Sequence, residues 1–110
     1  MSKRFLVAAG VALAALSTLA MSADYEAGKK LVTEKNCASC HGEQGNKPIT
    51  PETPKLAGQY ADYLEHALTA YKKGKRQNPM MSPMAQNLSK EEIRNLAYYF
   101  SKQEGLYKRY

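Results

Sequence analysis

The chain has 110 residues, of which 16 are Lys or Arg and 10 are Asp or Glu, so its formal net charge is +6. A chain of this length forms one small domain and buries only a modest fraction of its surface, which excludes a multidomain architecture. Domains this small often need an additional covalent or cofactor staple. No internal repeat or long low-complexity segment is present.

The N-terminus has the order of a secretory signal peptide. The positive segment 2–4 is followed by an almost unbroken apolar run over residues 5–20. This run is shorter than the roughly 20 residues of a membrane-spanning helix and ends in small residues, so cleavage is favoured over a retained anchor. We therefore expect residues 1–23 to be a signal peptide and 24–110 an exported, periplasmic domain. Cleavage one residue earlier, after Ser22, is the alternative.

The first predicted helix covers residues 24–35, and a Cys-Ala-Ser-Cys-His run follows it. A C-x-x-C-H run is the attachment site of a c-type haem, in which each thiol adds to one vinyl group and the histidine coordinates the iron. A dithiol redox centre or a zinc site is disfavoured, because no thioredoxin-like pattern surrounds the run and the only other histidine is His66. The motif predicts one covalently bound haem c per chain, held by Cys37 and Cys40 with His41 on the iron.

A second helix is predicted over residues 59–73, and a third from Ser89 to just before Gly105. Ser89 and Glu92 form a capping box at the start of the third. His66 points away from the apolar side of the second helix and is expected to be exposed. Nothing alternates with period two over a useful length, so the predicted fold class is all-α. The apolar faces are Tyr60, Tyr63, Leu64, Ala67, Leu68 and Tyr71 in the second helix, and Ile93, Leu96, Ala97 and Phe100 in the third.

Two segments are predicted to be irregular. Residues 42–58 are rich in Gly and Pro, and residues 74–88 contain Met80, Met81 and Met84. A histidine on one side of a haem iron leaves the sixth position open or filled by a second ligand, and a methionine thioether is one such ligand. Flexible methionines also fill irregular gaps in a core. We expect one of the three to be a ligand and two to be packing residues.

The mature chain resembles a class I cytochrome c over essentially its whole length. It is most similar to one domain of the bacterial group in which two such domains occur in tandem and bind two haems. A single C-x-x-C-H motif makes this chain a single-haem member. The resemblance is carried by Gly28-Lys29-Lys30-Leu31, by Cys37 to Gly42, by Pro54-Lys55-Leu56-Ala57-Gly58-Gln59, and by Met81 to Ser89.

The resemblance implies a small all-α fold, with three main helices wrapped around one covalently attached haem. It also implies that the first and last helices cross near Gly28, with Leu96 and Tyr99 opposite it. A glycine at such a crossing allows two helix backbones to approach closely. The tail after Gly105 has no role that the resemblance suggests.

Further site residues follow from the same resemblance. The Pro54 carbonyl would accept a hydrogen bond from the second ring nitrogen of the iron-binding histidine, and Leu56 would pack in the haem pocket. Met81, eight residues before the Ser89 cap, would be the second axial ligand of the iron. Met84 would then pack at the haem edge, and Met80 is the third choice.

Permanent ligation by a histidine and a methionine leaves no open site for a substrate, which argues against oxygenase or peroxidase chemistry. The predicted function is therefore that of a soluble periplasmic one-electron carrier, not an enzyme, with a low-spin haem and with redox proteins as partners. The alternatives are a cytochrome subunit of a periplasmic dehydrogenase complex and a haem-based gas sensor. Nucleic acid is not an expected partner, and nothing in the sequence demands more than a monomer.

A basic cluster, Lys72, Lys73, Lys75 and Arg76, precedes the methionine segment, and Lys47 lies in the other irregular segment. These cations either steer an acidic redox partner to the haem edge or form an ordinary solvated helix end.

Overall fold

The computed structural model describes residues 22–107, which form five helices and no strand. The prediction of an all-α fold is confirmed. The predicted signal peptide lies outside the described residues, apart from its last two positions. Within residues 22–107, no helix is long and apolar enough to cross a membrane. The helices are α1 (Tyr25–Glu34), α2 (Cys37–His41), α3 (Ala61–Lys72), α4 (Met81–Gln86) and α5 (Lys90–Ser101).

The three longest helices begin within two residues of the predicted starts, and α5 ends at Ser101, earlier than predicted. Side-chain caps set the starts of α1 and α5. The Asp24 carboxylate accepts a hydrogen bond from the Ala27 amide at 3.0 Å and so begins α1. The predicted capping box of α5 is confirmed: the Ser89 hydroxyl accepts from the Glu92 amide, and the Glu92 carboxylate accepts from the Ser89 amide at 2.9 Å.

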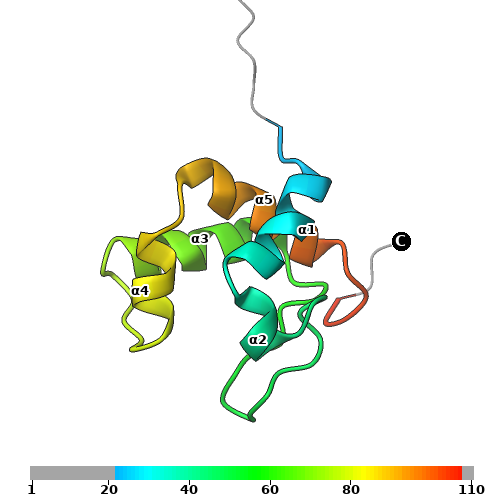
Figure 1. Ribbon diagram of the computed structural model, residues 1–110, viewed down its shortest axis with the longest axis horizontal. Helices are drawn as coiled ribbons and strands as arrows, with labels where there is room; N and C mark the ends of the chain where they lie inside the picture. The colour runs from blue at the N-terminus through cyan, green and yellow to red at the C-terminus, as the bar shows by residue number, and fades with distance from the viewer. Residues whose placement is uncertain (1–21, 108–110) are drawn as a thin grey trace, which may run out of the picture.

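The core lies where α1 crosses α5 (Figure 1), and Gly28 is at the crossing point. A Cβ at position 28 would clash with the Asn95 carbonyl oxygen and lie 2.9 Å from the Tyr99 Cβ. The Asn95 side chain also accepts a hydrogen bond from the Asp24 amide at 2.8 Å, which fixes the start of α1 on α5. The predicted crossing is confirmed, with Tyr99 and the Asn95 backbone nearest to Gly28, while Leu96 is buried in the adjoining core.

The four predicted core residues of α5 are all buried, but the predicted apolar face of α3 is too wide. Only Leu64 of that face is buried, whereas Tyr60 and Tyr63 are 52% and 50% exposed. Tyr60 precedes the first turn of α3 and stacks on Tyr107, with 4.8 Å between the ring centroids, instead of packing in the core. His66 is exposed, as predicted.

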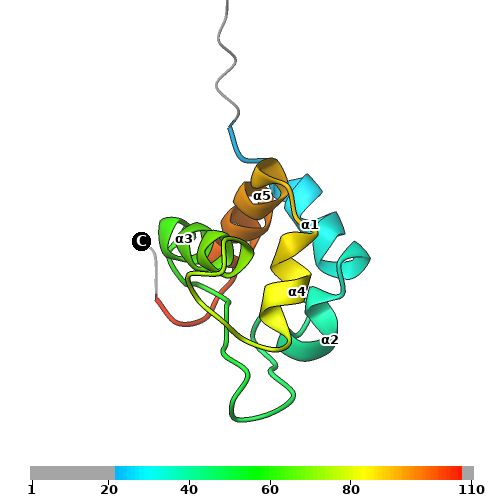
Figure 2. The ribbon, with the colours of Figure 1, turned by 90° about the vertical axis from the view of Figure 1, so that its left-hand side faces the viewer.

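Residues 74–88 were expected to be irregular, and this is wrong for Met81–Gln86, which form α4. The Asn78 side-chain oxygen accepts hydrogen bonds from the Met80 and Met81 amides at 2.8 and 2.9 Å, which supplies partners at the start of the helix. Pro83 lies in the first turn, where a missing N–H removes no intrahelical bond. Figures 1 and 2 both show α4 and α2 on the same side of the α1–α5 pair.

Candidate functional site

The C-x-x-C-H residues form the one-and-a-half-turn helix α2, and the surrounding backbone holds this helix at both ends. Asn36 adopts a left-handed conformation with φ 62°, which turns the chain from α1 into α2. At the other end, the Lys47 amide donates to the His41 carbonyl at 3.1 Å, and the Ile49 amide donates to the Cys40 carbonyl at 3.0 Å. These bonds satisfy carbonyls that a helix end leaves unpaired and fold the following loop against α2.

His41 is buried, with 6% of its surface exposed, and its ring is held in a defined orientation. Its Nδ1 lies 2.8 Å from the Pro54 carbonyl oxygen, so Nδ1 carries the proton and donates it. The hydrogen bond expected between these residues is therefore present. Burial lowers the pKa of His41, and the bond to Pro54 only partly opposes this effect, so the imidazole is held in the neutral form that coordinates metals. Nε2 keeps its lone pair for a ligand.

Cys37 and Cys40 are half-buried free thiols, and Cys37 packs against the hydrophobic core. Burial raises the pKa of the Cys37 thiol to about 11, an effect that its backbone hydrogen bond and the Lys35 charge oppose only in part. A dithiol redox centre requires the opposite shift, because the thiolate is the reacting species. The protonation of Cys37 therefore disfavours the dithiol alternative.

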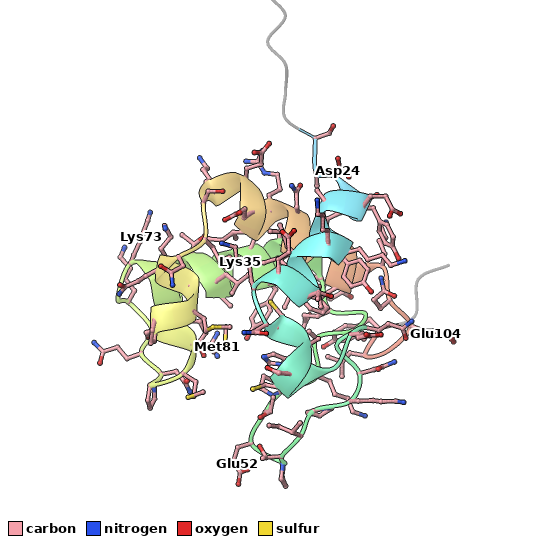
Figure 3. All side chains as sticks on the ribbon, in the orientation of Figure 1. Asp24, Lys35, Glu52, Lys73, Met81 and Glu104 are labelled. Atoms are coloured by element: carbon pink, nitrogen blue, oxygen red, sulfur yellow. The ribbon has the colours of Figure 1, made fainter. Side chains whose placement is uncertain are left out.

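The helix α4 presents two of the three methionines on one side. Met81 and Met84 are three residues apart, so they share a face, and both are half-buried. Ala85, next to that face, is fully buried, whereas Met80 is 67% exposed. Figure 3 shows the Met81 side chain on the side of α4 that faces α2. This placement suits Met81 as a ligand and Met84 as a packing residue, and it separates Met80 from both.

The loop between α2 and α3 brings Leu56 to the core. Leu56 is half-buried against the core cluster, and its amide donates to the Gly45 carbonyl at 2.7 Å. The Tyr99 hydroxyl donates to the Glu43 carbonyl at 3.1 Å, which ties the beginning of the same loop to α5. Pro54 and Leu56 are therefore held beside α2 by bonds from two directions.

The donor set of this site fits a covalently attached haem. Two thiols and one neutral imidazole with a free Nε2 come from a single short helix, α2. A thioether, from Met81, lies on the facing side of α4. Sulfur and imidazole are the ligands that haem iron accepts in electron-transfer proteins.

Comparison with known proteins identifies the class to which this fold and site belong. The sequence profile of the family described as cytochrome c matches residues 25–104. The chain belongs to the cytochrome c family, and as a member of it binds haem c covalently. The all-helical arrangement is shared with a solved structure, the reduced recombinant cytochrome c4 from Pseudomonas stutzeri, with a TM-score of 0.70 and 36% identity.

Two sequence relatives define the relation further. The chain is 45% identical over 71 residues to cytochrome c-554(548) of Halomonas halodenitrificans, which covers 62% of this chain and 84% of that one. It is 38% identical over 92 residues to the thiosulfate dehydrogenase electron acceptor of Stutzerimonas stutzeri, covering 77% of this chain and 41% of that one. The solved cytochrome c4 is matched over 77% of this chain and 48% of its own length. The predicted resemblance to one domain of a dihaem cytochrome is confirmed.

Sequence reasoning missed three side chains that shape the site. Lys72 was placed in the exposed basic cluster, but its ammonium group lies on backbone carbonyls next to α4. Asn78, followed by a proline, is a helix-start signal that could have located α4. The hydrogen bond between Tyr99 and Glu43 joins residues 56 positions apart, and no local sequence pattern predicts it.

Proposed function

We propose that this chain is a one-electron carrier whose haem c is attached to Cys37 and Cys40 and ligated by His41 and Met81. Bound haem c would supply an iron that alternates between the ferrous and ferric states. The observation that carries the proposal is the state of His41. Its Nδ1 is fixed on the Pro54 carbonyl and its Nε2 is free, and Met81 lies on the side of α4 that faces α2, the helix that contains His41.

The proposed ligands support electron transfer without a reaction on a substrate. Ligation by both His41 and Met81 would leave no coordination position on the iron for a substrate. The Met81 thioether is a soft, neutral ligand that favours ferrous iron and raises the reduction potential. The Pro54 carbonyl holds the orientation of the His41 imidazole and would make it a stronger donor to the iron. We therefore propose that the protein is not an enzyme.

The setting of the carrier is part of the same proposal. The signal-like residues 1–23 support export to the periplasm, where the protein would act in soluble form as a monomer. Its partners would be larger redox proteins that give and take single electrons. One relative is named as the electron acceptor of thiosulfate dehydrogenase, which supports an acceptor role of this kind.

The test is an optical titration of the purified holoprotein. A histidine–methionine carrier should show the long-wavelength sulfur-to-ferric-iron absorption band. The spectrum of its reduced form should not change when carbon monoxide is added at neutral pH. A carbon monoxide complex would overturn the proposal and favour a gas sensor. Stable copurification with a catalytic chain would replace the mobile carrier by a dehydrogenase subunit.

A further inference from the structure

Two lysines from different helices donate hydrogen bonds to three successive backbone carbonyls at the C-terminal end of α4, those of residues 86 to 88. The Lys72 ammonium, at the end of α3, lies 2.5 Å from the Leu88 carbonyl oxygen and 3.2 Å from that of Gln86. The Lys35 ammonium, at the end of α1, lies 3.4 Å from the Asn87 carbonyl oxygen. Each backbone carbonyl from residue 86 to residue 88 therefore accepts a hydrogen bond from a lysine.

These contacts matter because α4 has only six residues. A helix this short is not stable by itself in water, since nucleation is costly and few intrahelical bonds repay it. Its last carbonyls have no partner within the helix, and cations at this end also interact favourably with the helix dipole. The position of α4 therefore depends on contacts from outside the helix.

The other end of α4 is also held. The Asn78 side chain accepts from the Met80 and Met81 amides, and the Asn78 amide donates to the Ser82 hydroxyl at 3.0 Å. Met81, the first residue of α4, is thus fixed through its own backbone N–H. Lys35 extends the connection to α5, because its ammonium lies 3.8 Å from the Glu92 carboxylate of the capping box (Lys35 is labelled in Figure 3).

From this geometry we infer that Lys72, assisted by Lys35, is a positioning residue that locks α4 and so holds the Met81 sulfur on the iron. The inference rests on the proposed ligation by Met81. The hydrogen bonds of Lys72 go to the carbonyls of residues 86 and 88, and not to Met81 or to the haem-attachment residues. Lys72 therefore acts on Met81 only through the position of α4. Its removal should leave the donor set complete but allow α4 to move away.

The consequence is measurable as competition for the sixth coordination position. Imidazole is a neutral external ligand, so its binding to the ferric holoprotein reports how readily the methionine leaves, with little influence of charge. We expect Lys72→Met, which keeps an apolar side chain but no donor, to lower the imidazole dissociation constant about tenfold, because both charge-assisted hydrogen bonds of Lys72 are lost. The sulfur-to-iron band should also fade at a lower temperature than in the unchanged protein.

Two further variants make the result specific. Lys72→Arg keeps N–H donors for both carbonyls and should restore most of the difference. Lys29→Met removes the same charge from an exposed position of α1 and should bind imidazole like the unchanged protein. If Lys72→Met does not accumulate as holoprotein, Lys35→Met is measured instead and should show a smaller change in the same direction.

The outcomes separate the two proposals. Absence of the sulfur-to-iron band in the unchanged protein would overturn the ligation by Met81, and with it this inference. Presence of the band, with equal imidazole affinity for Lys72→Met and Lys29→Met, would overturn the positioning role of Lys72 alone. Where Lys35→Met is measured instead, equal imidazole affinity for Lys35→Met and Lys29→Met would overturn the positioning role.

Discussion

The Tyr99 hydroxyl, in the last turn of α5, donates a hydrogen bond to the Glu43 carbonyl, two residues beyond the buried imidazole of His41. This bond joins the longest-range packing of the molecule, between α1 and α5, to the loop that carries Pro54. The helix crossing and the candidate site are therefore directly connected through a hydrogen bond. A change in the core should therefore also alter the surroundings of the haem.

The first prediction concerns Tyr99→Phe, which removes the hydroxyl and keeps the ring. We expect a loss of about 1 kcal/mol in the free energy of unfolding at neutral pH, the usual net contribution of one hydrogen bond. Chemical denaturation of the holoprotein would measure this. Tyr63→Phe, at a half-exposed tyrosine, is the control and should have no comparable effect.

The ionisation of Tyr99 should also make the free energy of unfolding fall at alkaline pH. Burial raises the pKa of Tyr99, and the neighbouring Tyr25, Glu43 and Glu26 add to the effect. The folded state therefore keeps the proton at a pH where the unfolded chain, with a pKa of about 10, has begun to lose it. The contribution to stability is complete below pH ~10 and is lost as the pH rises through the folded pKa. The loss should be absent in Tyr99→Phe, and an identical alkaline slope in both proteins would contradict the assignment.

The second prediction tests the axial ligand. Met81→Ala should lose the sulfur-to-ferric-iron band and lower the reduction potential, because the soft thioether that favours ferrous iron is gone. Visible absorption and potentiometry measure the two effects. Met84→Ala should keep the band, and so should Met80→Ala at its exposed position. Retention of the band in Met81→Ala, with its loss in Met84→Ala, would reverse the roles of the two methionines.

The third prediction concerns the helix crossing. Gly28→Ala would place a methyl group against the Asn95 carbonyl, so α1 and α5 must separate. We expect a cost of about 1–3 kcal/mol, as for other overpacked cores. The midpoint of thermal unfolding should fall accordingly, while Lys29→Ala, one residue along and exposed, should leave it nearly unchanged. A Gly28→Ala protein as stable as the control would show that the crossing can relax without cost.

The sequence determined the elements whose signals are local. The starts of α1 and α5 follow from Asp24 and from the Ser89–Glu92 pair, which act on backbone within three residues of themselves. The C-x-x-C-H motif is local in the same sense, so its residues could be named without a structure. These predictions needed no knowledge of how the chain folds back on itself.

The remainder depends on tertiary contacts that no local pattern encodes. The helix α4 is held from the ends of α1 and α3, and Lys72 reaches carbonyls 14 and 16 residues further along. From the sequence alone, Lys72 could not be distinguished from its exposed neighbour Lys73. Periodicity also failed for Tyr60 and Tyr63, because an apolar side of a helix is buried only where another element covers it.

The last prediction concerns the basic cluster, which the structure reduces by one member. Lys73, Lys75 and Arg76 are exposed and, within residues 22–107, form no ion pair, while Arg76 lies over the Tyr71 ring at 4.9 Å from its centroid. They surround the turn that leads toward α4, so they suit the approach of an anionic partner (Lys73 is labelled in Figure 3). Oxidation of the ferrous protein by hexacyanoferrate(III) should then be fast at low salt and slow down as salt rises.

Replacing these three residues together by glutamine should slow that oxidation by roughly tenfold at low ionic strength, the lower end of electrostatic steering effects. The absorption spectrum should not change, because none of the three contacts the candidate ligands. A matched triple variant, with glutamine at Lys29, Lys30 and Lys102, removes the same charge elsewhere and should slow the reaction much less. A cationic cobalt(III) oxidant should show the opposite salt dependence. Equal rates for both triple variants would mean that only net charge matters, and that the cluster is an ordinary solvated helix end.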